Sequence, residues 1–148
     1  WNQLNHLCRC NNIPFVKYGA TFNNKDPRAL SIDDNQKFVQ QSFISPALQD
    51  DLQIKYQYIP CRIFKNISYG RMGITNNPLV YNLFNKNIIF DSNINDLFEK
   101  SINFEKNYDT NCHNTVINNM KYVMNNHTYI QRIESLKLFI NTNTIFNI

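Results

Sequence analysis

The stretch YIPCRIFKNISYGRMGITNN, Tyr58 to Asn77, contains the features that decide the fold. The chain of 148 residues has only three glycines, and two of them, Gly70 and Gly73, lie here. Glycine tolerates left-handed backbone and close contact with a neighbouring element. We therefore predict a helix that has Pro60 in its first turn and ends at Gly70. Gly73 is predicted to let the backbone approach a helix or a ligand closely.

Short apolar segments alternate with helical patterns on both sides of this stretch. We predict strands at residues 13–18, 42–45, 72–75 and 88–91. Helical patterns follow at 31–41, 47–53, 60–69, 77–84 and 92–104, and from 109 to 140. Ser31 with Asp34 is a capping-box-like start, Asn76 or Asn77 caps the helix that contains Pro78, and Ser92 caps the next one.

Strands of about four residues separated by helices indicate βα units and a parallel sheet. We predict a Rossmann-like α/β fold of about four short parallel strands flanked by helices, with a C-terminal helical tail. The expected organisation is one domain: an entry strand and helix at 1–41, a βα core at 42–104 and the tail at 105–148. Ligands of such sheets bind outside the carboxyl ends of the strands, where helices present free N–H groups. Those ends carry Ser45, then Thr75, Asn76 and Asn77, then Asp91, Ser92 and Asn93.

Three segments carry a resemblance to a known family: RIFKNISYGRMGITNN, LFNKNIIFDSNINDLFEK and HTYIQRIESL. Their order and spacing resemble the C-terminal half of a GT-B glycosyltransferase, closest to the CgeB-like spore-maturation group. The resemblance covers residues 42–140. It implies that this chain binds a nucleotide-diphosphate sugar for transfer to an unknown acceptor, without a cofactor and without a metal.

The resemblance also implies a donor-binding site. The diphosphate would lie at the N-terminus of the helix that begins near Cys61, with Arg62 contacting phosphate oxygens. The glycine that ends this helix is Gly70, and the polar rim adds Ser45, Thr75, Asn76 and Asn77. Family members carry a glutamate five residues before the glycine, where it holds donor hydroxyls. This chain has Lys65 there, and lysine cannot accept a hydrogen bond as a carboxylate does.

Two alternatives stay open at this point. GT-B enzymes have two Rossmann-like domains, and 148 residues leave no room for the N-terminal, acceptor-binding one. Because the chain also begins with Trp rather than Met, we expect a C-terminal fragment or a stand-alone half whose catalytic residues cannot be identified. The alternative is a non-catalytic, degenerate Rossmann-like interaction module, which Lys65 favours. In the structural interpretation, Thr75, Asn76 and Asn77 only cap the next helix. Arg62 and Lys65 then form only a solvent-exposed helix face.

Composition narrows the function classes. The net charge is +4 and no Lys/Arg-rich face is evident, so nucleic acid is not an expected partner. No apolar run is long enough to span a membrane. We interpret the abundance of Asn, Lys and Ile, whose codons are A/T-rich, as genomic. The scattered cysteines predict a reducing cytoplasm rather than a disulfide framework. His6, Cys8 and Cys10 form a cluster that lacks the paired spacing of a zinc site, so no metal is predicted.

Overall fold

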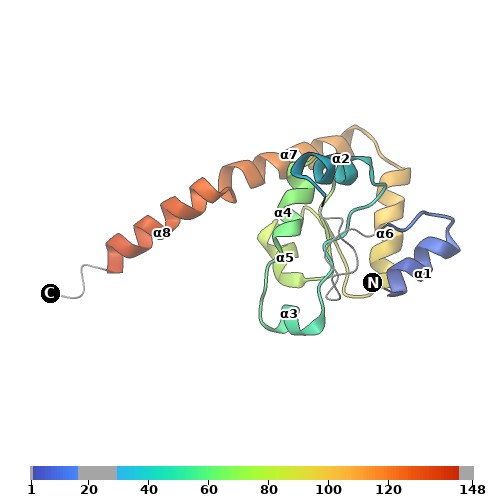
Figure 1. Ribbon diagram of the computed structural model, residues 1–148, viewed down its shortest axis with the longest axis horizontal. Helices are drawn as coiled ribbons and strands as arrows, with labels where there is room; N and C mark the ends of the chain where they lie inside the picture. The colour runs from blue at the N-terminus through green and yellow to red at the C-terminus, as the bar shows by residue number, and fades with distance from the viewer. Residues whose placement is uncertain (1, 17–29, 144–148) are drawn as a thin grey trace.

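The computed structural model describes residues 2–16 and 30–143 and shows a mostly helical α/β fold. A small parallel sheet lies in the middle, with α4 and α5 on one side of it and α1 and α6 on the other (Figure 1). Helix α7 packs against α4, and α8 continues from α7 away from the rest of the chain. The described helices are α1 (Asn2–Cys10), α2 (Ile32–Gln41), α3 (Asp51–Lys55), α4 (Cys61–Ser68), α5 (Pro78–Leu83), α6 (Ile94–Lys106), α7 (Thr110–Asn126) and α8 (Tyr129–Asn143).

The described sheet has two strands, β1 (Ile74–Thr75) and β2 (Ile89–Phe90), which pair in parallel. In register, Ile74 lies opposite Ile89 and Thr75 opposite Phe90. Both strands fall inside predicted segments, so the parallel α/β class is confirmed. The prediction of about four strands is wrong for the described residues.

The strand predicted at 42–45 is displaced and reduced to a single bridge. Ala47, not Ser45, pairs with Thr75, and the Ala47 N–H donates to the Ile74 carbonyl at 2.9 Å. Pro46 has no N–H, so a ladder cannot run through it. A third extended segment therefore lies beside β1 in parallel, but it pairs at one residue only.

The strand predicted at 13–18 does not form over Ile13–Val16, and residues 17 and 18 lie outside the described part. Ile13 and Phe15 instead pack against the apolar cluster between α1 and α6. That cluster buries Leu4, Cys8, Phe98 and Ile102. The segment is extended and half-buried, but its apolar side chains meet helices rather than a neighbouring strand. Helix α1, which covers this cluster, was not predicted.

The second and larger apolar cluster lies under α4, α5 and α7. Ile63 and Ile67 of α4 are fully buried in it, together with Val80, Phe84 and Ile88. The close approach of β1 to this cluster depends on Gly73. A Cβ at Gly73 would lie 2.7 Å from a methyl group of Ile88 and 2.9 Å from one of Ile67. The predicted need for glycine is confirmed, and the neighbours are a helix and the residue before β2.

Four described helices end with a residue in the left-handed region, and only one of these residues is glycine. After α4, the Gly70 N–H donates to Ile67 and the Arg71 N–H to the Asn66 carbonyl, which is a Schellman ending. Asparagine adopts this conformation more readily than most side chains. This preference accounts for Asn12 (φ 54°) and Asn85 (φ 51°) but not for the other residues. Those are Gln57 (φ 55°), Gly70 (φ 82°) and Lys86 (φ 63°), which follows Asn85 after α5.

Two of the predicted helix starts are confirmed, two are displaced by one residue, and the helix predicted at 47–53 forms at Asp51–Lys55 instead. Ser31 accepts a hydrogen bond from the Asp34 N–H, and Asn77 caps α5 with Pro78 in the first position. Pro60 is the cap residue of α4 rather than a member of its first turn, and Asn93 rather than Ser92 caps α6. The C-terminal helical tail is present as α7 and α8. Over the described ranges, no helix combines the length and apolar character that crossing a membrane requires.

Candidate functional site

The start of α4 is fixed at the carboxyl edge of the parallel strands. The Tyr58 carbonyl, three residues before α4, accepts a hydrogen bond from the Gln49 side chain at 2.6 Å and one from Asn77 at 3.2 Å. Gln49 follows the bridge residue Ala47, and Asn77 follows β1. The ends of two neighbouring extended segments therefore hold the chain directly before α4. This is the edge at which the sequence predicted a ligand site.

A buried amide network makes this attachment. Asn76 and the Gln49 backbone exchange two hydrogen bonds of 2.8 Å, and the Asn77 amide donates to the Gln49 side-chain oxygen at 2.8 Å. Asn77 also accepts from the Leu79 N–H, and Thr75 accepts from the Asn77 N–H. All these side chains are buried. Their polar atoms serve to join the strand ends to the start of α4, which is the capping interpretation of Thr75, Asn76 and Asn77.

Three of the predicted site residues are exposed on α4: Cys61 and Arg62 are its first two residues, and Lys65 lies in its last turn. The predicted binding of a diphosphate also depends on the N–H groups at the N-terminus of α4. Its cap residue is Pro60, and within residues 2–16 and 30–143 no side chain caps α4 through a hydrogen bond. The first N–H groups of a helix carry partial positive charge and need acceptors. An uncapped start on a helix that also exposes one guanidinium and one ammonium group is therefore suited to an anion.

Ser45 and Gly70 lie away from this helix start. The Ser45 carbonyl accepts a hydrogen bond from Asn66, which is in the second half of α4. Gly70 follows the C-terminus of the same helix, where Met120 of α7 is the nearest side chain to its missing Cβ. Eight helical residues separate the two ends by about 12 Å. The structure thus brings Cys61, Arg62, Thr75, Asn76 and Asn77 to one edge. Lys65 lies in the last turn of α4, and Ser45 and Gly70 are not at that edge.

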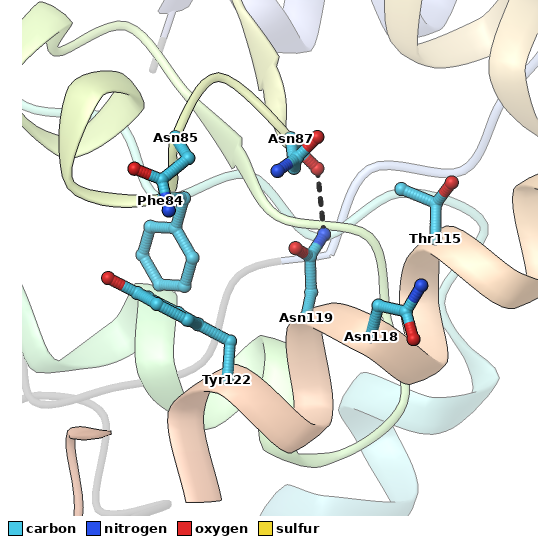
Figure 2. Close-up of a pocket in the computed structure, with 7 residues that line it drawn as sticks. All are labelled: Phe84, Asn85, Asn87, Thr115, Asn118, Asn119 and Tyr122. Carbon is cyan, nitrogen blue, oxygen red and sulfur yellow. Dashed lines mark hydrogen bonds between the residues drawn. The ribbon is translucent and has the colours of Figure 1, made fainter. Parts of the chain in front are cut away.

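A cavity of about 270 Å³ opens at the opposite edge of the strands, where the turn after α5 meets α7 (Figure 2). The rings of Phe84 and Tyr122 form one wall, and Asn119 donates to the Asn87 carbonyl at 2.7 Å. Because Asn87 precedes β2, this cavity is at the amino end of the strands. Sequence reasoning missed it, since its asparagines are indistinguishable from the many others in the chain. The lining residues are Phe84, Asn85, Asn87, Thr115, Asn118, Asn119 and Tyr122.

The two regions differ in charge. None of the residues lining the cavity is charged at neutral pH, whereas α4 presents Arg62 and Lys65. A phosphate group needs N–H donors and positive charge. The start of α4 is therefore the better candidate for an anionic ligand.

Asp91, at the carboxyl end of β2, forms a structural ion pair. Its carboxylate lies 2.7 Å from the Lys100 ammonium and accepts from the Asn93 N–H at 2.9 Å. The hydrogen bond from Lys100, followed by that from Asn93, lowers the pKa of Asp91 below its ordinary value. An ionised, already bonded carboxylate holds the turn between β2 and α6 and is not suited to be a proton acceptor for a reaction.

His127 occupies an aromatic cluster at the C-terminus of α7. Its ring lies 5.0 Å from Phe64 and 5.2 Å from Tyr122, and Arg132 of α8 lies over the Phe64 ring at 5.2 Å. Burial, with a smaller contribution from the nearby Arg132 charge, lowers the pKa of His127. The neutral imidazole therefore packs the junction of α7 and α8 against α4.

The His6, Cys8 and Cys10 cluster does not converge on one point. The Cys10 thiol lies 3.6 Å from His6, but Cys8 is buried in the α1–α6 cluster, and burial raises the pKa of its thiol. Within residues 2–16 and 30–143, no three His, Cys, Asp or Glu side chains gather as metal ligands.

Comparison of the chain with protein-family models, with curated proteins and with solved structures finds no match. The glycosyltransferase resemblance therefore stays a prediction that rests on the order and spacing of motifs in residues 42–140.

Proposed function

We propose that this chain is the donor-binding half of a glycosyltransferase and holds the diphosphate of a nucleotide sugar at the start of α4. The observation that carries the proposal is the attachment of Tyr58 to Gln49 and Asn77, which sets an uncapped helix start at the carboxyl edge of the strands. Arg62 and Lys65 add positive charge on the exposed face of α4. Backbone N–H groups, the helix dipole and these two cations together match a diphosphate.

The chemistry at this site is stabilisation of a leaving group. When the bond between the sugar and the diphosphate breaks, the negative charge on the diphosphate grows, and fixed positive groups lower the energy of that transition state. Arg62 supplies a planar donor set that can bind two phosphate oxygens at once. The proposal covers donor binding and leaving-group stabilisation, and it assigns no residue to the activation of the acceptor.

A second candidate function is a non-catalytic interaction module, and Lys65 is the residue that favours it. The family position that accepts hydrogen bonds from donor hydroxyls is here an exposed lysine, which only donates. A domain that retained the fold and lost donor binding would bind no nucleoside diphosphate. The two candidates therefore differ in a property that is measured directly.

Replacing Arg62 by alanine is expected to weaken the binding of a nucleoside diphosphate by about 1.5–3 kcal/mol, as for a hydrogen bond to a charged group. This corresponds to a rise in Kd of roughly 10- to 150-fold. The measurement is a calorimetric or NMR titration with UDP, GDP and ADP, the tightest of which is then used for the variant.

The matched control is Lys37→Ala, which removes one positive charge from the exposed surface of α2. Its Kd should stay within about twofold of the parent because it loses only long-range attraction, which salt screens. Equal weakening in both variants would mean that net charge, not the start of α4, attracts the ligand. A folded Arg62→Ala variant with unchanged affinity would exclude Arg62 from the site.

A further inference from the structure

The cavity between α7 and the turn after α5 contains a hydrogen-bond acceptor that lacks a donor. The Asn119 side chain is 4% exposed, and its amide nitrogen donates to the Asn87 carbonyl at 2.7 Å. Figure 2 shows its amide oxygen, Oδ1, turned toward the rings of Phe84 and Tyr122. Among the residues that the structure describes, none donates a hydrogen bond to this oxygen. Because buried amide oxygens are normally hydrogen-bonded, its donor must come from a molecule inside the cavity.

The walls of the cavity are apolar although two of its residues carry hydroxyl groups. The Tyr122 hydroxyl donates to the Leu83 carbonyl at 2.9 Å, and the Thr115 hydroxyl donates to the Asn111 carbonyl, also at 2.9 Å. Figure 2 shows the methyl group of Thr115, rather than its oxygen, on the side of Asn119. The aromatic ring of Tyr122 and the methyl group of Thr115 therefore provide apolar contact surface around the buried oxygen.

Side-chain amides supply the rest of the polar lining. Asn85, Asn87 and Asn118 are exposed, and an amide can both donate and accept hydrogen bonds. None of the described lining residues is charged at neutral pH. A charged ligand would lose hydration in the cavity without gaining a partner of opposite charge. The cavity therefore suits a neutral ligand that donates to Asn119 and exchanges hydrogen bonds with amides.

The shape of the cavity favours a puckered ring over a flat one. The rings of Phe84 and Tyr122 lie with their centroids 5.6 Å apart and their planes tilted by 58°. A flat base stacks between parallel faces, which these two rings do not form. A saturated ring can present C–H groups to both. The volume of about 270 Å³ is just below the usual range of ligand pockets, so it fits a ligand of single-ring size.

We propose that this cavity binds a monosaccharide unit, a neutral ring that carries several hydroxyl groups. One hydroxyl donates to Oδ1 of Asn119, and others exchange hydrogen bonds with the amides of Asn85 and Asn118. The C–H face of the sugar packs on the Tyr122 ring. The proposal does not rest on the diphosphate site, because the two sites share no residue and lie at opposite edges of the strands.

An amide NMR titration of the whole chain tests this binding. The probes are the methyl glycosides of glucose, galactose and mannose at high millimolar concentration. One of them should shift the signals of Asn118 and Asn119 and leave those of Cys61 and Arg62 unchanged. Tetrahydropyran, which is the same ring without hydroxyl groups, and the neutral base cytosine should have no such effect. No shift from any glycoside, or equal shifts from tetrahydropyran or cytosine, would overturn the proposal.

The free sugars identify the source of the bound unit. Tighter binding of the glycoside than of its free sugar would indicate the terminal unit of a glycan. The reverse order would indicate a free monosaccharide, whose additional hydroxyl group is then bound as well.

Two variants locate the binding in the cavity. Thr115→Phe extends a larger side chain from α7 into the cavity and should abolish saturation transfer from the protein to the glycoside. Asn118→Ala removes one exposed amide and should raise the Kd by about two- to tenfold, as for a neutral hydrogen bond. The matched control is Thr142→Phe, which makes the same change on the exposed surface of α8 and should bind as the parent does. Unchanged affinity in a folded form of either cavity variant would overturn the proposal.

Discussion

Replacement of Asn77 by alanine is expected to lower the free energy of unfolding by between about 2 and 5 kcal/mol. The side chain is 1% exposed and makes three hydrogen bonds, to Leu79, Gln49 and Tyr58. Alanine removes the cap of α5 and leaves the Gln49 side-chain oxygen buried without its donor. Urea denaturation followed by circular dichroism measures the loss.

Asn77→Asp separates the two contributions. Aspartate keeps the oxygen that accepts from Leu79 and is as good a cap as asparagine. It loses the donor to Gln49 and Tyr58 and places a carboxylate against their oxygens. We therefore expect Asn77→Asp to destabilise the fold about as much as Asn77→Ala, by more than 2 kcal/mol.

The control is the exposed Asn93, which caps α6 with a hydrogen bond of 2.9 Å to the Asn95 N–H. Asn93→Asp should change stability by less than about 0.5 kcal/mol, and Asn93→Ala should cost about 1 kcal/mol. If Asn77 and Asn93 respond alike to aspartate, Asn77 acts only as a cap, and the buried network does not hold the start of α4.

Gly73→Ala is expected to destabilise the fold by about 1–3 kcal/mol, the cost of overpacking a core. The added Cβ would lie 2.7 Å from Ile88 and 2.9 Å from Ile67, closer than carbon atoms pack. Without that contact, alanine would be favoured by about 0.5–1 kcal/mol because glycine loses more conformational freedom on folding. The sign of the change in urea denaturation therefore decides whether packing or chain entropy dominates.

The double variant Gly73→Ala with Ile67→Val identifies the contact. Valine lacks the methyl group of Ile67 that lies 2.9 Å from the added Cβ. The double variant should be less destabilised than the sum of the two single variants, as for residues in direct contact. Strict additivity would place the cost of Gly73→Ala elsewhere than at the contact between β1 and α4.

Local chain chemistry predicted several helix boundaries and both described strands, although it missed α1 and placed the start of α3 four residues too early. Ser31 and Asn77 carry side-chain acceptors at helix starts, Pro78 fits the first helical position, and Gly70 adopts φ +82° after α4. Each of these features depends on residues within a few positions in sequence. The same reasoning explains Gly73 only in part, because its neighbours Ile67 and Ile88 are known only from the tertiary packing.

The predictions of two further strands failed because an apolar segment in the sequence does not show whether another strand lies beside it. Ile13 and Phe15 bury their side chains against α1 and α6, and the segment before Ala47 is interrupted by Pro46. The hydrophobic periodicity and the composition of a segment indicate which of its side chains are buried. Whether the backbone N–H groups meet a neighbouring strand depends on segments far away in sequence.

The candidate site was predicted in part for the same reason. Arg62 and Lys65 are exposed on α4, and the rim residues Thr75, Asn76 and Asn77 lie at the same edge as the start of that helix. Capping propensity correctly placed these residues at a strand end. It did not reveal that Asn76 and Asn77 form hydrogen bonds with Gln49 and Tyr58, since those partners are 19 to 28 positions away. The rim residues position α4, and the proposed ligand-binding groups lie at the start of that helix.

The central claim is that the start of α4 binds a nucleoside diphosphate. Its most direct test is an amide NMR titration of the isotope-labelled chain with UDP, GDP, ADP and CMP at millimolar concentration. We predict that one diphosphate shifts the amide signals of Cys61, Arg62 and Ile63 most strongly and leaves those of Asn118 and Asn119 in the distant cavity unchanged. A dispersed spectrum that none of the four nucleotides alters, or shifts confined to the cavity, would contradict the claim.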